Sequence, residues 1–103
     1  MTQRIHVLTP GHCYGLDPLE PGPYQELQFI QKEQRDGEFV TVENGTTSET
    51  VLRVLIHRLN HLQAKASCRE NSIAITHLET ALLWLEKQTA DRTARGVEGT
   101  PQA

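Results

Sequence analysis

The longest regular pattern in the sequence is that of a helix running from Ser67 to Thr100. Ser67 and Glu70 have the spacing of a capping box, in which each side chain accepts a hydrogen bond from the other residue's backbone N–H. The far end carries two arginines and then Gly96, a combination that favours the end of a helix. Between these ends, apolar residues recur on one helical face: Ala74, Leu78, Ala81, Leu82 and Leu85.

A helix of this length has consequences for assembly. From Cys68 to Arg95 it would span roughly 42 Å. A chain of 103 residues with 37% hydrophobic and 5% aromatic side chains builds one thin core, and small chains commonly compensate by oligomerising. We therefore expect part of the apolar stripe to pack against another copy of the protein.

A second helix is predicted just upstream, over residues 47–65. Thr46 and Glu49 have capping-box spacing at its start. Val51 and Val54 widen its apolar face, so this helix should be covered on more than one side. The stripe itself consists of Leu52, Leu55, Ile56, Leu59 and Leu62. Only two residues separate the two helical patterns, and so short a connection predicts an antiparallel hairpin.

The N-terminal half carries strand patterns instead. The expected strands are Arg4–Thr9, Tyr24–Lys32 and Glu38–Glu43. Asp36-Gly37 is a hairpin-turn signal between the last two. Residues 10–23 hold four prolines and three glycines and are predicted to be a connecting loop.

Together these patterns predict an α+β fold in one domain, residues 1–103. A small antiparallel β-sheet of two to three strands should occupy residues 1–45, and a long antiparallel helical hairpin residues 46–96. Residues 97–103 are expected to form a C-terminal tail.

The charge balance argues against a general nucleic-acid binder, because such proteins are normally basic and this chain has a net charge of −3. Residues 1–45 carry three basic and seven acidic side chains, a net −4, whereas residues 46–103 carry seven and six, a net +1. The helical half can therefore offer local arginines to a small anion. No apolar run approaches the roughly 20 residues that cross a bilayer. Two cysteines and no secretory segment indicate a reduced cytosol.

The candidates for catalysis are weak. His57 and His61 have the i, i+4 spacing of a metal-binding pair, but no third ligand is evident, and ordinary surface histidines are the alternative. Cys68 lies at a helix start beside Arg69, a setting of some reactive cysteines, yet no His or Asn partner is evident. We expect no enzymatic activity, no catalytic residues, no metal and no cofactor.

Polar residues at the two ends of the longer helix suit an anionic ligand. Near its start, where free N–H groups favour phosphate, lie Arg69, Asn71, Ser72 and Thr76. Near its end, on one face, lie Gln88, Arg92 and Arg95. Arginine forks are preferred partners of phosphates. The alternative interpretation is a solvated face whose cations complement the helix dipole.

Three sequence blocks, CREN, TADR and RGVEGT, occur together in the helical half. With them, the hairpin resembles that of the phage anti-Thoeris sponge proteins, and it is similar to that of the phage anti-CBASS sponges. The segment LQFIQKE…GEFVTVENGTT resembles the small sheet that precedes the hairpin in the anti-Thoeris family. The resemblance covers most of the chain and is weakest over residues 1–23.

This resemblance implies a non-catalytic sponge for nucleotide immune signals. The expected ligands are cyclic ADP-ribose variants made by bacterial TIR enzymes, and for some members cyclic di- or trinucleotides at a separate site. The family implies a dimer or a hexamer built from dimers, encoded by a phage and acting in the cytoplasm of the infected host. The rival hypothesis is a helical-hairpin interaction module that binds a host defence protein.

The resemblance also assigns residues. Asn71 is predicted to contact the adenine or ribose hydroxyls and Arg92 to hold the pyrophosphate, with Arg95 nearby. Gln88 stands where the family usually has an arginine, which removes a charge from the anion site. His61 lies near an aromatic position of relatives; Tyr14, Tyr24 and Phe29 are alternatives for stacking on the purine.

Arg69 and Thr76 are carried over to a cyclic trinucleotide site. Asn71 and Arg92 are 21 residues apart, roughly 32 Å along one helix. We therefore expect one subunit's helix start to meet another subunit's helix end in a shared pocket.

Overall fold

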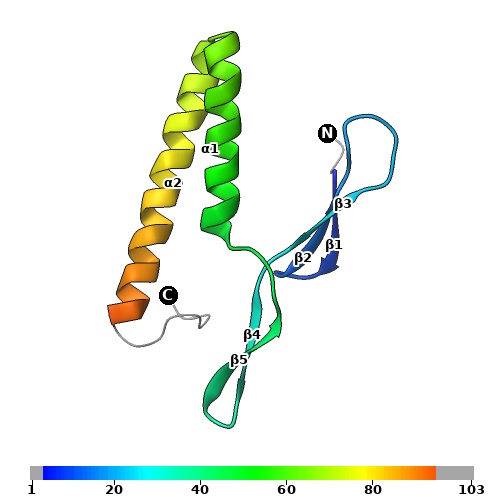
Figure 1. Cartoon of the computed structure of the whole chain (residues 1–103), viewed down its shortest axis with the longest axis vertical. Helices are drawn as coiled ribbons and strands as arrows, with labels where there is room; N and C mark the ends of the chain where they lie inside the picture. Colours follow the sequence, from blue (N-terminus) through cyan, green and yellow to red (C-terminus); the bar gives the residue numbers. More distant parts are fainter. Residues whose placement is uncertain (1–3, 95–103) are drawn as a thin grey trace. The chain divides into compact units, whose positions relative to one another are not determined.

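The computed structural model describes residues 4–94, and the chain divides into two compact units, Met1–Thr46 and Thr47–Ala103. The first unit contains the strands and the second the helices (Figure 1). The predicted α+β fold, antiparallel β-structure followed by a long helical hairpin, is therefore confirmed. None of the helices in the described part of the chain is long and apolar enough to span a membrane.

The first unit begins with a three-stranded antiparallel sheet in the order β1-β2-β3. Its strands are β1 (Ile5–Thr9), β2 (Cys13–Leu16) and β3 (Gln25–Gln28). Tyr14 of β2 pairs with Val7 on one side and with Leu27 on the other, so this face of the sheet is apolar. On the other face, Gly15 is buried because the Tyr24 ring covers it; a Cβ there would lie 2.9 Å from Tyr24 Cδ1.

The prediction that residues 10–23 form only a loop is wrong, because Cys13–Leu16 is the central strand β2. Thr9, Pro10, Gly11 and His12 make the turn that leads into it: His12 N donates to Thr9 O at 2.9 Å, and Gly11 has a φ of 80°. Proline followed by a glycine of positive φ is typical of a type II turn. The many prolines and glycines of this segment predict a loop and give no sign of the strand. The four residues of β2 have a weak intrinsic β-propensity, and pairing with two neighbouring strands outweighs it.

The predicted strand Tyr24–Lys32 is also divided in the structure. Its first part is β3, and its second part, β4 (Gln31–Arg35), pairs with β5 (Glu38–Glu43) in a separate two-stranded sheet. Between them the backbone pairs with Thr46: Thr46 N donates to Gln28 O, and Ile30 N to Thr46 O, both at 2.9 Å. Two small sheets therefore replace the one expected.

The hairpin between β4 and β5 forms where its turn signal predicts. Asp36 and Gly37 have φ values of 51° and 80°. Positive φ at both central residues is the type I′ geometry, which matches the twist of the flanking strands.

The second unit is an antiparallel hairpin of α1 (Ser48–Lys65) and α2 (Arg69–Ala94) (Figure 1). The cap of α1 is Thr47 rather than Thr46, because Thr47 Oγ1 accepts from Thr50 N at 3.2 Å. The start of α2 at Arg69 is likewise one residue later than a Ser67 cap would place it. The predicted helix end at Gly96 and the tail at 97–103 lie outside the described residues.

Polar contacts and a thin apolar seam join the helices. Arg53 and Glu86 form an ion pair at 3.0 Å, and Thr89 Oγ1 donates to Glu49 Oε2 at 2.8 Å. Ile75, which the predicted stripe left out, is 9% exposed and is the buried apolar residue of α2. By contrast, Leu83 and Trp84 of α2 are each 67% exposed. A single chain therefore leaves much apolar surface uncovered.

Candidate functional site

Arg92, near the end of α2, has the most unusual polar environment in the described chain. The residue is half-buried, and its Nε atom is buried without a hydrogen-bond partner among residues 4–94. A buried donor with no acceptor is costly, because it has lost water and gained nothing in return. The guanidinium has no hydrogen bond to another described residue that an incoming anion would have to break, but Nε has almost no accessible surface and is reached only if the side chain or its surroundings move.

Gln88 lies one turn before Arg92 and is also half-buried. Residues at i, i+7, i+14 and i+18 share one face of a helix, and on α2 these are Ala74, Ala81, Gln88 and Arg92. This face is therefore apolar toward the start of α2, where the two alanines lie, and polar toward its end, where Gln88 and Arg92 can donate hydrogen bonds. We call the four residues the α2 flank.

Asn71 lies at the opposite end of α2, in its first turn, and is half-buried. Because α2 is one continuous helix, about 32 Å of axial rise separates Asn71 from Arg92. The structure of one chain therefore does not bring the two predicted ligand-binding residues together.

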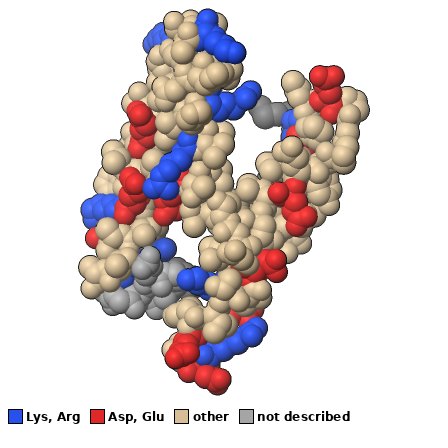
Figure 2. Space-filling model, viewed as in Figure 1, with Lys and Arg blue, Asp and Glu red and all other residues tan. Residues whose placement is uncertain are grey.

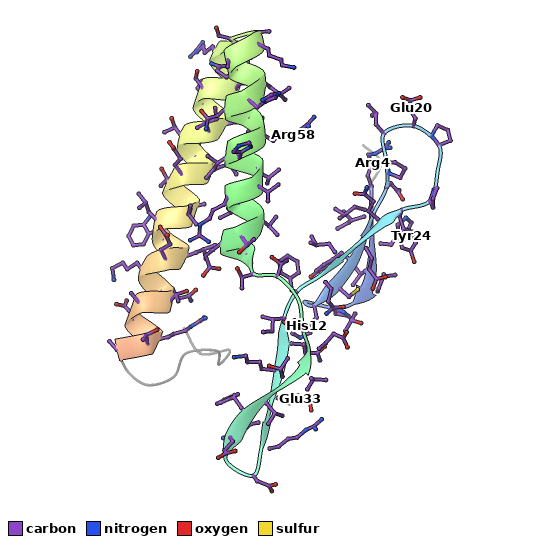
Figure 3. All side chains as sticks on the ribbon, viewed as in Figure 1. Arg4, His12, Glu20, Tyr24, Glu33 and Arg58 are labelled. Atoms are coloured by element: carbon purple, nitrogen blue, oxygen red, sulfur yellow. The ribbon has the colours of Figure 1, made fainter. Side chains whose placement is uncertain are left out.

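His61 is on α1, at the same end of the hairpin as Asn71, since Gln63 of α1 donates a hydrogen bond to Ser72 of α2 at 2.6 Å. Two residues turn a helix through about 200°, so His61 points away from the side on which Gln63 meets α2. His61 is exposed, and Arg58, one turn earlier, also projects away from α2 (Figure 3). His61 and Asn71 thus do not face one another within one chain.

Arg69 and Thr76 are both exposed and share one face of α2, two turns apart. Thr76 Oγ1 donates to the Ser72 carbonyl oxygen at 3.1 Å, so its hydroxyl proton is already used. The oxygen can still accept a hydrogen bond. Arg95, the last of the predicted ligand-binding residues, lies outside the described residues.

The aromatic alternatives to His61 have structural roles in the first unit. Tyr14 packs edge-on against Phe29 with ring centroids 6.0 Å apart, and its hydroxyl accepts from Gly11 N at 3.0 Å. Tyr24, labelled in Figure 3, covers Gly15, and its ring centroid lies 5.3 Å from that of His6. Tyr14 and Phe29 are half-buried by this packing, whereas Tyr24 remains 47% exposed.

The cysteines and histidines show no assembled reactive centre in the described residues. Burial and the hydrogen bond to Glu26 (3.2 Å) raise the pKa of the Cys13 thiol, which disfavours a thiolate nucleophile there. Cys68 is exposed. Within residues 4–94, no three His, Cys, Asp or Glu side chains are grouped so that they could hold a metal ion.

The charged side chains of the hairpin are mixed rather than gathered. Figure 2 shows both basic and acidic side chains on this face of the helices. Lys87 and Asp91 form an ion pair at 3.1 Å. A polynucleotide needs a continuous basic track, which this face lacks. A small anion needs only one or two suitably placed donors.

Comparison with known proteins identifies the family of the hairpin. The family model described as Acb2/Tad1, hairpin domain, matches residues 27–90, which is more than half of the chain. Over 58 residues the chain is 52% identical to "Thoeris anti-defense 1" of Bacillus phage SBSphiJ7. That alignment covers 55% of this chain and 41% of the relative, so the chain matches less than half of the relative's length.

Proposed function

Because this chain belongs to the Acb2/Tad1 hairpin family, we propose that it is a phage-encoded sponge that binds cyclic ADP-ribose-type immune signals without cleaving them. Sequestration of the signal in the cytoplasm of the infected bacterium would keep the Thoeris effector inactive. The proposal is supported by the family match and by the name of the relative, which is an anti-defence protein.

The structural observation that carries the proposal is the buried, unpartnered Nε of Arg92. A pyrophosphate supplies charged oxygen acceptors, and charge-assisted hydrogen bonds to a guanidinium are about twice as strong as neutral ones. Gln88, half-buried on the same face one turn away, adds an amide donor for a phosphate or ribose oxygen.

A shared pocket between two copies reconciles the distance from Asn71 to Arg92. The midpoint between these residues is Ala81–Leu82. If two α2 helices cross antiparallel about a twofold axis at that point, Asn71 of one copy lies level with Arg92 of the other. Ala74 and Ala81 on the α2 flank are small enough for the second helix to approach closely. Such a dimer would contain two equivalent pockets.

Arg69 and Thr76 are proposed to serve a second site for a cyclic di- or trinucleotide. Both are exposed on a face of α2 that lies away from the α2 flank, so a larger assembly of dimers would be needed to enclose a ligand there. A protein that is only a dimer should lack this site. Titration of a cyclic tri-adenylate into the wild-type protein and Arg69→Ala tests it.

The sponge proposal is tested by thermal shift and calorimetry with cyclic ADP-ribose isomers and purified protein. A ligand at 100 times its Kd stabilises the folded state by about 2.7 kcal/mol, which is a visible shift for a domain of this size. After denaturation of the complex, the ligand should be recovered intact. Recovery of a cleaved product would instead indicate a phosphodiesterase-like enzyme.

The same experiment separates the sponge from an interaction module that binds a host defence protein. The module needs its protein partner, so the purified chain alone would leave the nucleotide in solution. Depletion of the nucleotide by the purified chain supports the sponge.

A further inference from the structure

The side-chain amide of Gln63 on α1 joins the two helices at the tip of the hairpin. Its Oε1 accepts from the backbone N–H of Cys68, and its Nε2 donates to the Cys68 carbonyl oxygen, both at 3.0 Å. The same Nε2 donates to Ser72 Oγ at 2.6 Å. Cys68 directly precedes α2, and its carbonyl oxygen also accepts from Ser72 N at 3.3 Å. One side-chain amide of α1 therefore hydrogen-bonds both the N–H and the carbonyl oxygen of Cys68, at the start of α2.

Asn71 lies between the two residues that Gln63 holds. The backbone of a helical turn is fixed by its hydrogen bonds, so anchoring Cys68 and Ser72 fixes the height and the rotation of the turn that carries Asn71. A binding group works only when it is held within about 0.5 Å of its productive position. The position of the Asn71 backbone, from which its side chain projects, thus depends on a residue of the other helix.

We propose that Gln63 is a positioning residue, which orients Asn71 toward a bound cyclic nucleotide without contacting that ligand itself. This inference rests on the proposed function. Sequence spacing alone did not suggest it, because the hydrogen bonds of Gln63 cross the connection between the helices.

A double-mutant cycle distinguishes positioning from a general contribution to folding. If Gln63 acts through Asn71, then Gln63→Ala should weaken binding in the wild-type background and not in an Asn71→Ala background. A general structural role would produce the same loss in both backgrounds. Folding of the variant is expected, because alanine has a higher helix propensity than glutamine and Gln63 is only half-buried.

The experiment uses calorimetry with the full chain and the cyclic ADP-ribose isomer that binds the wild-type protein. Gln63→Ala should weaken binding by roughly 5- to 30-fold, the factor expected if Asn71 loses one or two ordinary hydrogen bonds to the ligand. In the Asn71→Ala background its effect should be less than about twofold. The matched control is Asn60→Ala. Asn60 Nδ2 donates to Ile56 O of its own helix at 2.9 Å, so its loss should leave binding unchanged.

Amide hydrogen exchange supplies a readout that does not depend on the ligand. In Gln63→Ala the Cys68 amide should exchange faster, while amides in the middle of α2 keep their protection. Equal losses of affinity in both backgrounds, or no effect of Gln63→Ala on binding, would overturn this inference alone. Absence of binding by the wild-type protein would overturn the proposed function together with it.

Discussion

At the scale of single residues, Arg92 combines a charge with an unfavourable environment. A structural arginine normally finds acceptors for its buried N–H groups, whereas Arg92 Nε has none among the described residues. Such a group costs stability in the free protein and is tolerated where it serves a ligand. This contrast between stability and binding gives the first prediction.

Replacement of Arg92 by methionine should separate the two roles. Arg92→Met keeps much of the side-chain volume and removes the unpaired donor, so the unliganded protein should be as stable as wild type or more stable. Affinity for cyclic ADP-ribose should fall at least tenfold, since a charge-assisted hydrogen bond contributes about 1.5–3 kcal/mol. The control Arg53→Met breaks the exposed Arg53–Glu86 pair, which should cost no more than about 1 kcal/mol and leave binding unchanged. A destabilised Arg92→Met protein that still binds normally would contradict the assignment.

Gln88→Arg restores the charge that related proteins are expected to have at this position. A second guanidinium one turn from Arg92 should tighten pyrophosphate binding. In the free protein the like-charge pair should cost about 0.2–0.5 kcal/mol. Ala90→Arg adds the same charge on the outer side of α2 and serves as the control. Calorimetry showing unchanged or weaker binding for Gln88→Arg would count against the role of this face.

The sequence was sufficient to select Gln88 and Arg92 as neighbours on one face, because helical periodicity fixes that relation. It could not show that Arg92 Nε is buried, nor that Gln63 holds the start of α2, since both depend on contacts between elements. The proposed roles of His61 and Asn71 in one pocket require a second copy, which periodicity within one chain does not describe.

At the scale of elements, α1 and the start of α2 were predictable to within about a residue, as were the strands β1 and β5, whereas β2 was missed and Tyr24–Lys32 was not recognised as two strands. Both helices have long periodic patterns, which local sequence determines well. The strand β2 has four residues including a buried glycine, and its existence depends on pairing with β1 and β3. The break at Phe29–Ile30 likewise depends on Thr46, which is distant in sequence.

The position of the α1 cap is directly testable. Thr47→Ala removes the side-chain oxygen that accepts from Thr50 N and should destabilise the helical hairpin by about 1 kcal/mol. Thr46→Ala is the matched control, because the hydrogen bonds of Thr46 to Gln28 and Ile30 use its backbone. Thermal unfolding followed by circular dichroism measures both. A larger loss of stability for Thr46→Ala than for Thr47→Ala would indicate that Thr46 is the cap, as the sequence pattern predicted.

Gly45 is required where the chain leaves the second sheet. A Cβ at this position would lie 2.4 Å from Gln28 O and 2.6 Å from Phe29 C, and these backbone atoms cannot move aside without breaking the Thr46 pairing. Gly45→Ala should therefore destabilise the N-terminal unit by about 1–3 kcal/mol. Gly22→Ala is the control, since its Cβ would make only ordinary contacts, the nearest at 3.7 Å. Chemical denaturation monitored by NMR signals of the strands would show the difference, and equal stabilities would contradict this packing.

At the scale of the whole molecule, the exposed apolar surface of the hairpin is the main constraint. The buried hydrophobic residues of the described chain are Cys13 and Ile75, while Val54, Leu83 and Trp84 are more than 60% exposed. Two helices with so thin a seam gain little stability from one another, because helix stability comes mainly from the packing of an apolar face. Association of copies would supply the missing packing and would also complete the proposed pocket.

Ala81 is the residue at which assembly and binding can be tested together. In the proposed dimer it lies at the twofold axis, about 16 Å from Arg92 along α2, so it cannot touch a ligand held by Arg92.

Ala81→Arg should place two like charges against each other at the axis and shift the dimer to monomer, as measured by sedimentation. Cyclic ADP-ribose binding should be lost with it, although Asn71 and Arg92 are intact. Ala90→Arg, on the outer side of α2, should leave both unchanged. A monomeric Ala81→Arg protein that still bound the nucleotide tightly would mean that one chain builds the whole pocket. Because α2 holds Asn71 and Arg92 about 32 Å apart, the two residues could then not both contact the ligand, and the shared pocket would be wrong.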